Sequence, residues 1–198
     1  MSVAPRLERD EMVITCWPYA LDALRHLIDG EFDKAEELAQ EVLEIGTRTG
    51  NALATVTYGG TLFWARFHQD RLHEIVEFLP GTSPMPALAA TVACGYAMVG
   101  RLDDARQILG PIEAVGLDRF PRDQGWLAGL LDLAIVYSHL KDEDRAPELL
   151  QVLAETDDRL VGVPGSWLGP VDYYRGLLCE TTGDLRSGLE TRWSANRS

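Results

Sequence analysis

The residues with metal-ligand side chains gather at one place in the sequence. His68, Asp70, His73 and Glu74 lie within seven positions, and imidazole and carboxylate groups are ligands that zinc commonly takes in proteins. The two histidines are five residues apart, which places them about 140° apart on a helix, and we expect a turn between them. The spacing therefore favours a polar turn at the start of a helix over a metal site, and we predict neither a metal nor another cofactor.

The sequence contains no pattern for nucleophilic or phosphate chemistry. It lacks the Gly-x-Ser-x-Gly turn of serine hydrolases, and Ser83, Ser138 and Ser166 have no histidine and acid partners in a recognisable order. The stretch 46–50, GTRTG, lacks the lysine–serine ending of a phosphate-binding loop. We therefore predict that the chain is not an enzyme. In the alternative, scattered acids assemble a site inside the fold, and this predicts a buried carboxylate that titrates near neutral pH.

Charge and composition limit the partners and the location. The 198 residues are 46% hydrophobic, enough to form a core, and the net charge of -13 repels phosphate backbones and anionic lipid. Direct binding to nucleic acid or membranes is therefore not predicted. Cys16, Cys94 and Cys179 are odd in number, far apart and set among apolar residues, which predicts reduced, buried thiols. Since the first ten residues lack an apolar signal core and no apolar run is long enough to span a membrane, we expect a cytoplasmic protein. Arginine outnumbers lysine, which is typical of bacterial proteins from GC-rich genomes.

A similar sequence motif occurs twice in the chain. It predicts the secondary structure elements on which any functional site would lie. GEFDKAEELAQ at 30–40 and GRLDDARQILG at 100–110 each place a glycine after an apolar helical run and an alanine five residues later. The glycine predicts a tight turn between two helices. The alanine predicts a crossing at which the helix backbones approach closely, since only a small side chain fits there.

Weaker copies of this unit fill the rest of the chain. The turn positions follow one another at intervals of 39, 31, 41 and 42 residues and are Gly30, Gln69, Gly100, Lys141 and Gly183. They predict an all-α, right-handed solenoid of the tetratricopeptide type in a single domain, 1–198, with approximate hairpins 11–49, 51–79, 86–116, 122–156 and 166–197. The Pro- and Gly-rich stretches 79–86 and 161–170 are predicted to be irregular, and no segment alternates for long enough to indicate a sheet.

Aromatic residues on the first helices of the hairpins are the candidate binding residues. In tetratricopeptide arrays these helices line the concave face, so Trp126, Tyr137 and Tyr173 are the candidate partner groove. The alternative is that they pack between helices, because large aromatic side chains form much of any core. The first helices carry few basic residues, so we expect such a groove to accept a basic or apolar segment rather than an acidic one.

The segments 120–153 and 158–185 resemble the C-terminal helical-repeat region of large bacterial signalling ATPases. In that group an AAA-type nucleotide-binding domain precedes the repeats, and a class III adenylyl or guanylyl cyclase domain or a LuxR-like DNA-binding domain completes the protein. The features that carry the resemblance are Pro121–Asp123 followed by Trp126, the irregular stretch 161–169, Tyr174 and Gly183. The resemblance implies a regulatory or transcriptional-regulator module that binds a protein, a peptide or a neighbouring domain.

The end of the chain departs from that group. Arg186, Ser187 and Gly188 stand where an acid and an alanine are usual, and the sequence stops at Ser198 where further helices normally follow. We expect either a fragment of a longer protein or a shortened stand-alone paralogue. A further alternative is a structural adaptor that self-associates through the apolar face beyond Leu189 and Trp193.

Overall fold

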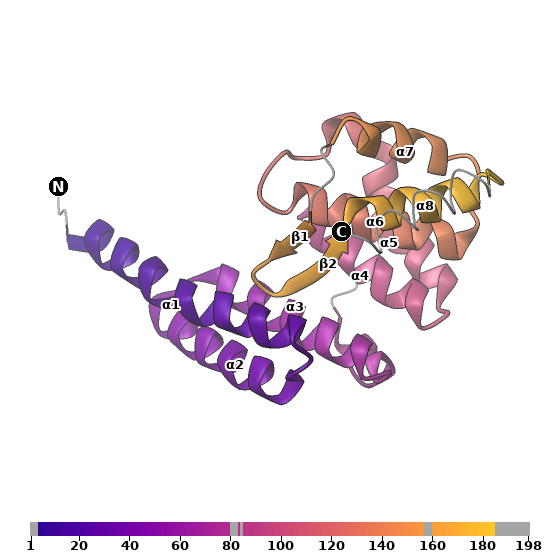
Figure 1. Cartoon of the computed structure of the whole chain (residues 1–198). Coiled ribbons are helices and arrows are strands. Elements are labelled where there is room, and N and C mark those ends of the chain that lie inside the picture. Colours follow the sequence, from indigo (N-terminus) through magenta and orange to yellow (C-terminus); the bar gives the residue numbers. More distant parts are fainter. Residues whose placement is uncertain (1–3, 80–82, 84, 157–159, 185–198) are drawn as a thin grey trace. The chain divides into compact units, whose positions relative to one another are not determined.

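The computed structural model describes residues 4–79, 83, 85–156 and 160–184, and these residues are mostly helical (Figure 1). They fall into two compact units. Unit 1 consists of the described residues up to Glu74 together with Gly162–Trp167, and unit 2 consists of Ile75–Val161 and the described residues from Leu168 onward. Among the described residues, no helix is long and apolar enough to cross a membrane.

Unit 1 begins with the predicted first hairpin. α1 (Ala4–Ile28) and α2 (Phe32–Thr49) are joined by a turn in which Gly30 has a φ of 78°, a conformation that favours glycine. α2 packs in turn on α3 (Ala52–His68). The core between these helices includes Cys16, Ala20 and Val42.

The second predicted hairpin, 51–79, keeps only its first helix. α3 ends at His68, and the positions where the second helix was expected form two short 3-10 turns, η1 (Leu72–Glu74) and η2 (Val76–Phe78). Glu74 stands where the other copies have alanine, and its carboxylate accepts two 2.8 Å hydrogen bonds from Arg71. A charged side chain at this position does not permit the close helix crossing that the alanine allows.

Unit 2 contains two further helical hairpins and one additional helix. α4 (Pro86–Met98) pairs with α5 (Leu102–Val115), which is followed by η3 (Leu117–Arg119), and α6 (Trp126–Leu140) leads through Lys141 into α7 (Ala146–Ala154). α6 is central, because it packs on both α4 and α8 (Val171–Thr181).

The alanines five residues after the turns confirm their predicted packing role. Ala35, Ala105 and Ala146 are all completely buried at the start of the second helix of a hairpin. The left-handed turn conformation occurs at Gly100 and also at the non-glycine Lys141, which has a φ of 53°.

The stretch 161–170 is a β-hairpin, not the irregular segment that the sequence predicted. β1 (Leu160–Val163) and β2 (Ser166–Pro170) form a two-stranded sheet. Strands of four and five residues are too short to display a clear period-two pattern.

The tip of this hairpin packs backbone to backbone on α3 within unit 1. A Cβ atom at Gly60 would lie 2.5 Å from the carbonyl oxygen of Gly165, and a Cβ at Gly165 would lie 2.5 Å from the carbonyl oxygen of Thr57. Both glycines are therefore required for this contact. The second helix of the fifth predicted hairpin, with Leu189 and Trp193, lies outside the described residues.

Candidate functional site

The three aromatic residues predicted to form a groove do not share one open surface. Tyr137 is only 2% exposed, and burial raises the pKa of its hydroxyl well above the usual value. Trp126 is half-buried with the guanidinium of Arg122 4.7 Å from its ring centre. Tyr173 is 37% exposed and its ring meets Tyr174 edge-on. The burial of Tyr137 fits the packing alternative, because a partner cannot reach this side chain while unit 2 is folded.

His68 and Glu74, from the cluster of residues with metal-ligand side chains, contribute to packing and ion pairing. His68 stacks on Phe32 with ring centres 5.9 Å apart, and burial lowers the pKa of its imidazole. Glu74 pairs with Arg71. The described part of the chain contains no group of three or more histidine, cysteine or acidic residues arranged to hold a metal ion.

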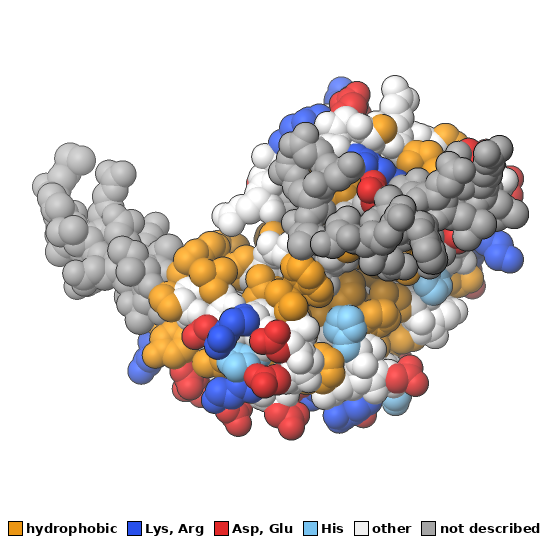
Figure 2. All heavy atoms as spheres, viewed as in Figure 1, with side chains coloured by type: hydrophobic (Ala, Val, Ile, Leu, Met, Phe, Trp, Pro, Cys, Tyr) orange, Lys and Arg blue, Asp and Glu red, His pale blue; other side chains and the backbone are white. Residues whose placement is uncertain are grey.

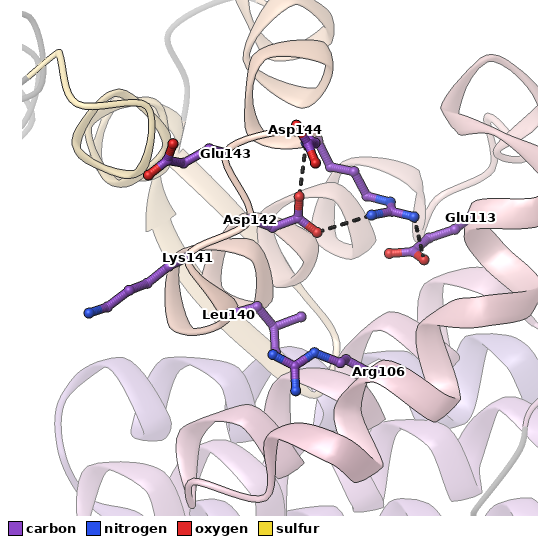
Figure 3. Close-up of a pocket in the computed structure, with 8 residues that line it drawn as sticks. Arg106, Glu113, Leu140, Lys141, Asp142, Glu143 and Asp144 are labelled. Carbon is purple, nitrogen blue, oxygen red and sulfur yellow. Dashed lines mark hydrogen bonds and ion pairs between the residues drawn. The ribbon is translucent and has the colours of Figure 1, made fainter.

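An open pocket of about 590 Å³ lies between α5 and the turn that joins α6 to α7 (Figure 3). Its charges largely compensate one another: Arg145 makes ion pairs of 3.0 Å with Glu113 and 3.2 Å with Asp142. Burial raises the pKa of Glu113. In Figure 3 the side chain of Lys141 points away from this network. The residues that line this pocket therefore mainly form an ionic network, and this network holds the α6–α7 turn against α5.

Unit 2 also contains a buried acid in the middle of the apolar helix α6. Asp132 is 2% exposed, and its Oδ2 atom is 2.5 Å from Thr91 Oγ1, whereas Oδ1 is buried with no hydrogen-bond partner. Burial raises the pKa of this carboxyl to about 7. This is the titration behaviour that the enzymatic alternative predicted. However, the carboxyl group is shielded from solvent, so a substrate could touch it only if unit 2 opened.

The number of protons available for the hydrogen bonds around Asp132 also favours its neutral form. Thr91 Oγ1 lies 3.2 Å from the carbonyl oxygen of Ala87 as well as 2.5 Å from Asp132, but a hydroxyl has only one proton to donate. If Asp132 is protonated, its carboxyl donates to Thr91 and Thr91 donates to Ala87, so both contacts are hydrogen bonds. The sequence signal for this group is a single acid in an otherwise apolar run, WLAGLLDLAIVY.

Several exposed apolar side chains of unit 1 lie along α1. Trp17, Leu21 and Ile28 are 45%, 47% and 46% exposed, and Leu24 between them is half-buried. We call these four residues the α1 stripe. Figure 2 shows hydrophobic side chains gathered over the part of the surface where Figure 1 labels α1. The spacing of four, three and four residues is that of the seam between two helices in a coiled coil.

The α1 stripe is separate from the side of α1 that forms the core. The core side consists of Cys16, Ala20, Ala23 and Leu27, which face α2 and α3 on the helical wheel. Along one border the stripe meets the β-hairpin tip, where a Cβ at Gly162 would lie 3.6 Å from Leu24. Leu24 is therefore partly covered by the β-hairpin, whereas Trp17, Leu21 and Ile28 remain nearly half exposed.

The C-terminal end of the stripe leads into an acidic turn. Asp29, Glu31 and Asp33 are all exposed in the six residues after Ile28. The same turn lines an open pocket of about 590 Å³, together with Phe32, His26 and Gln69. His26 makes an ion-pair contact with Glu31. An apolar helical surface thus ends beside a patch of negative charge, all within unit 1.

No family model, curated protein or solved structure matches the chain. The α1 stripe and its acidic end are the features whose exposure and spacing indicate a binding site.

Proposed function

We propose that this chain is a non-catalytic, tetratricopeptide-like module that binds a protein partner or a neighbouring domain. The observation that carries the proposal is the α1 stripe, in which three large apolar side chains are nearly half exposed at the spacing of a helix–helix seam. The helical hairpins α1–α2, α4–α5 and α6–α7 support a helical-repeat scaffold.

The exposed area sets the scale of the binding energy. Complete burial of a large apolar side chain contributes about 1.5–3 kcal/mol. Because Trp17, Leu21 and Ile28 are each already about half buried, covering them contributes about 3 kcal/mol in total on that scale. This is less than the entropic cost of association. A partner must therefore also use the surroundings of the stripe, and it is those surroundings that distinguish one partner from another.

The proposed role is regulatory. The resemblance to the repeat region of bacterial transcriptional regulators and nucleotide cyclases supports a module whose occupancy is passed to another domain. In this role the chain supplies recognition, and the chemistry belongs to the protein that it binds or to which it is joined.

A display selection tests the proposal. A random peptide library is selected on the folded chain and counter-selected on the variant Leu21→Asp, with circular dichroism to confirm that both proteins are folded. We expect enriched peptides whose affinity falls at least about tenfold in Leu21→Asp and in Trp17→Ala, the loss typical of a central interface residue. The proposal is wrong if repeated selections yield no peptide whose binding depends on either residue.

A further inference from the structure

We propose that the α1 stripe binds an amphipathic helix of a partner protein, and that this helix carries cationic side chains at the end that lies over the α1–α2 turn. The inference rests on the proposed function and identifies the chemistry of its partner. It follows from two features of unit 1 that adjoin each other: the spacing of the apolar stripe and the exposed acids at its end.

The geometry of the stripe selects a helix. Trp17 to Ile28 span eleven positions, or roughly 17 Å at 1.5 Å per residue, which is about three helical turns. Side chains spaced alternately by four and three residues form holes that receive the side chains of a second helix. An extended peptide would instead need a free strand edge with which to form backbone hydrogen bonds. α1 presents no such edge, because its interior backbone groups are bonded within the helix apart from the one bond that Pro18 cannot donate.

The charges at the end of the stripe select a cationic partner. Asp29 and Asp33 are exposed and have no ion-pair partner among the described residues. Lys34, which follows Asp33 in the sequence, is held 2.8 Å from Glu37, and Asp33 acts on Arg71 only at longer range. The negative C-terminal end of the α1 dipole meets the positive N-terminal end of α2 at this turn, so the attraction for a cation comes from the carboxylates. Cations over this turn therefore gain two exposed carboxylates, neither of which is held in a close ion pair among the described residues.

The net charge disfavours a second copy of the chain as the occupant. Two copies would each bring a net charge of -13, and their mutual repulsion opposes association. A basic helix is attracted by the same field. The stripe is thus better matched to a different protein than to itself.

Two matched synthetic peptides test the inference. Each is a helix of about 14 residues with leucines at the coiled-coil spacing; one has lysines at both ends and the other has glutamates, so the orientation of binding need not be known. Fluorescence anisotropy measures their affinities for the full chain. We expect the lysine peptide to bind about tenfold more tightly, the effect of two exposed ion pairs. Added salt should reduce this preference by screening.

Variants of the chain assign the effect to the two features. Leu21→Asp should abolish binding of the lysine peptide, whereas Leu53→Asp, at a leucine of similar exposure on α3, should leave it unchanged. The pair Asp29→Asn and Asp33→Asn should remove most of the preference for lysine. The matched pair Glu41→Gln and Glu44→Gln, at exposed acids on α2, should retain it. Trp17→Ala provides a second stripe variant if Leu21→Asp does not fold.

The outcomes separate this inference from the proposed function. If both peptides bind equally and Leu21→Asp abolishes both, the cationic requirement is wrong and the binding module remains. If the chain alone forms a dimer that Leu21→Asp dissociates, as measured by analytical ultracentrifugation, a second copy is the occupant and the inference is overturned. If neither peptide binds while the display selection succeeds, the helix is the wrong occupant. Failure of the selection as well would reject the proposed function itself.

Discussion

The substitution Asp132→Asn should reverse its effect on stability between acidic and alkaline pH. In the folded protein, burial raises the pKa of Asp132 from 3.8 to about 7, so the fold favours the neutral carboxyl. At any pH between these two values the unfolded chain ionises while the folded chain does not. The free energy of unfolding therefore falls as pH rises from about 4 to about 7 and is constant with respect to this group above that range.

The size of the effect follows from the shift. Each unit of pKa corresponds to 1.36 kcal/mol, so the full change is about 4 kcal/mol, of which about 3 kcal/mol falls between pH 5 and pH 8. Asparagine has the same shape and does not ionise, but its buried amide carries one donor more than the neutral carboxyl of Asp132, at a cost of about 1–3 kcal/mol. We expect the variant to be less stable than the wild type near pH 4.5 and more stable at pH 8.

Urea unfolding of both proteins at several pH values measures this difference. Other groups titrate in the same range: burial lowers the pKa values of His68 and His139, which makes stability rise with pH as the unfolded chain loses its protons. Their contribution cancels in the difference between wild type and variant. Asp103→Asn, at a fully exposed side chain, is the matched control and should show no such crossover. If the difference in the free energy of unfolding between wild type and variant does not change with pH, Asp132 is not a neutral, buried carboxyl in the folded protein.

Three other consequences of the structure can be measured directly. Gly60→Ala should lower the free energy of unfolding by about 1–3 kcal/mol, because its Cβ would collide with the hairpin tip. Gly59→Ala, whose Cβ meets open space, should raise the free energy of unfolding by up to about 1 kcal/mol. Equal effects of the two substitutions in urea unfolding would contradict this. Arg66 and Glu36 form a bidentate ion pair, and their side chains are only 16% and 24% exposed. A double-mutant cycle should therefore give a coupling energy of about 1–2 kcal/mol. A coupling energy near zero would mean that the pair behaves like an ordinary surface ion pair. Cys94 is completely buried, and burial raises the pKa of its thiol. A thiol reagent should therefore label Cys94 at least about a hundredfold more slowly than free cysteine, as measured by mass spectrometry. Rapid labelling of the native protein would contradict this burial.

The features that the sequence predicted are those in which a residue type determines local geometry. Gly30 and Gly100 adopt the left-handed conformation at the predicted turns, and the alanines that follow them are buried where the helices cross. The predicted burial of the three free cysteines is also confirmed. In each case a single small or permissive side chain is enough to specify the structure.

The features that the sequence did not predict depend on what packs around a residue. The apolar run before Gly30 predicted a helix, but not that α2 and α3 would leave Leu21 and Ile28 nearly half exposed. The apolar run around Asp132 is a local signal of a buried helix, but the enclosure of its carboxyl depends on α4 and α8, which pack against α6. The turns after α3 depart from the repeat because Glu74 replaced a small residue, a consequence of tertiary packing rather than of helix propensity.

The two units depart from the usual distribution of polar and apolar groups in opposite ways, and each departure requires a different compensation. Unit 1 exposes apolar side chains along the α1 stripe, and only another molecule or domain can remove them from water. Unit 2 encloses the carboxyl of Asp132, and a proton is sufficient to compensate it. If the proposals are correct, stability measured without a partner should therefore respond to pH through Asp132 and be nearly unaffected by conservative changes in the stripe. Binding of a partner should instead be sensitive to changes in the stripe and nearly independent of the ionisation of Asp132. If a stripe substitution such as Leu21→Ala unfolded the protein, these side chains would belong to the core.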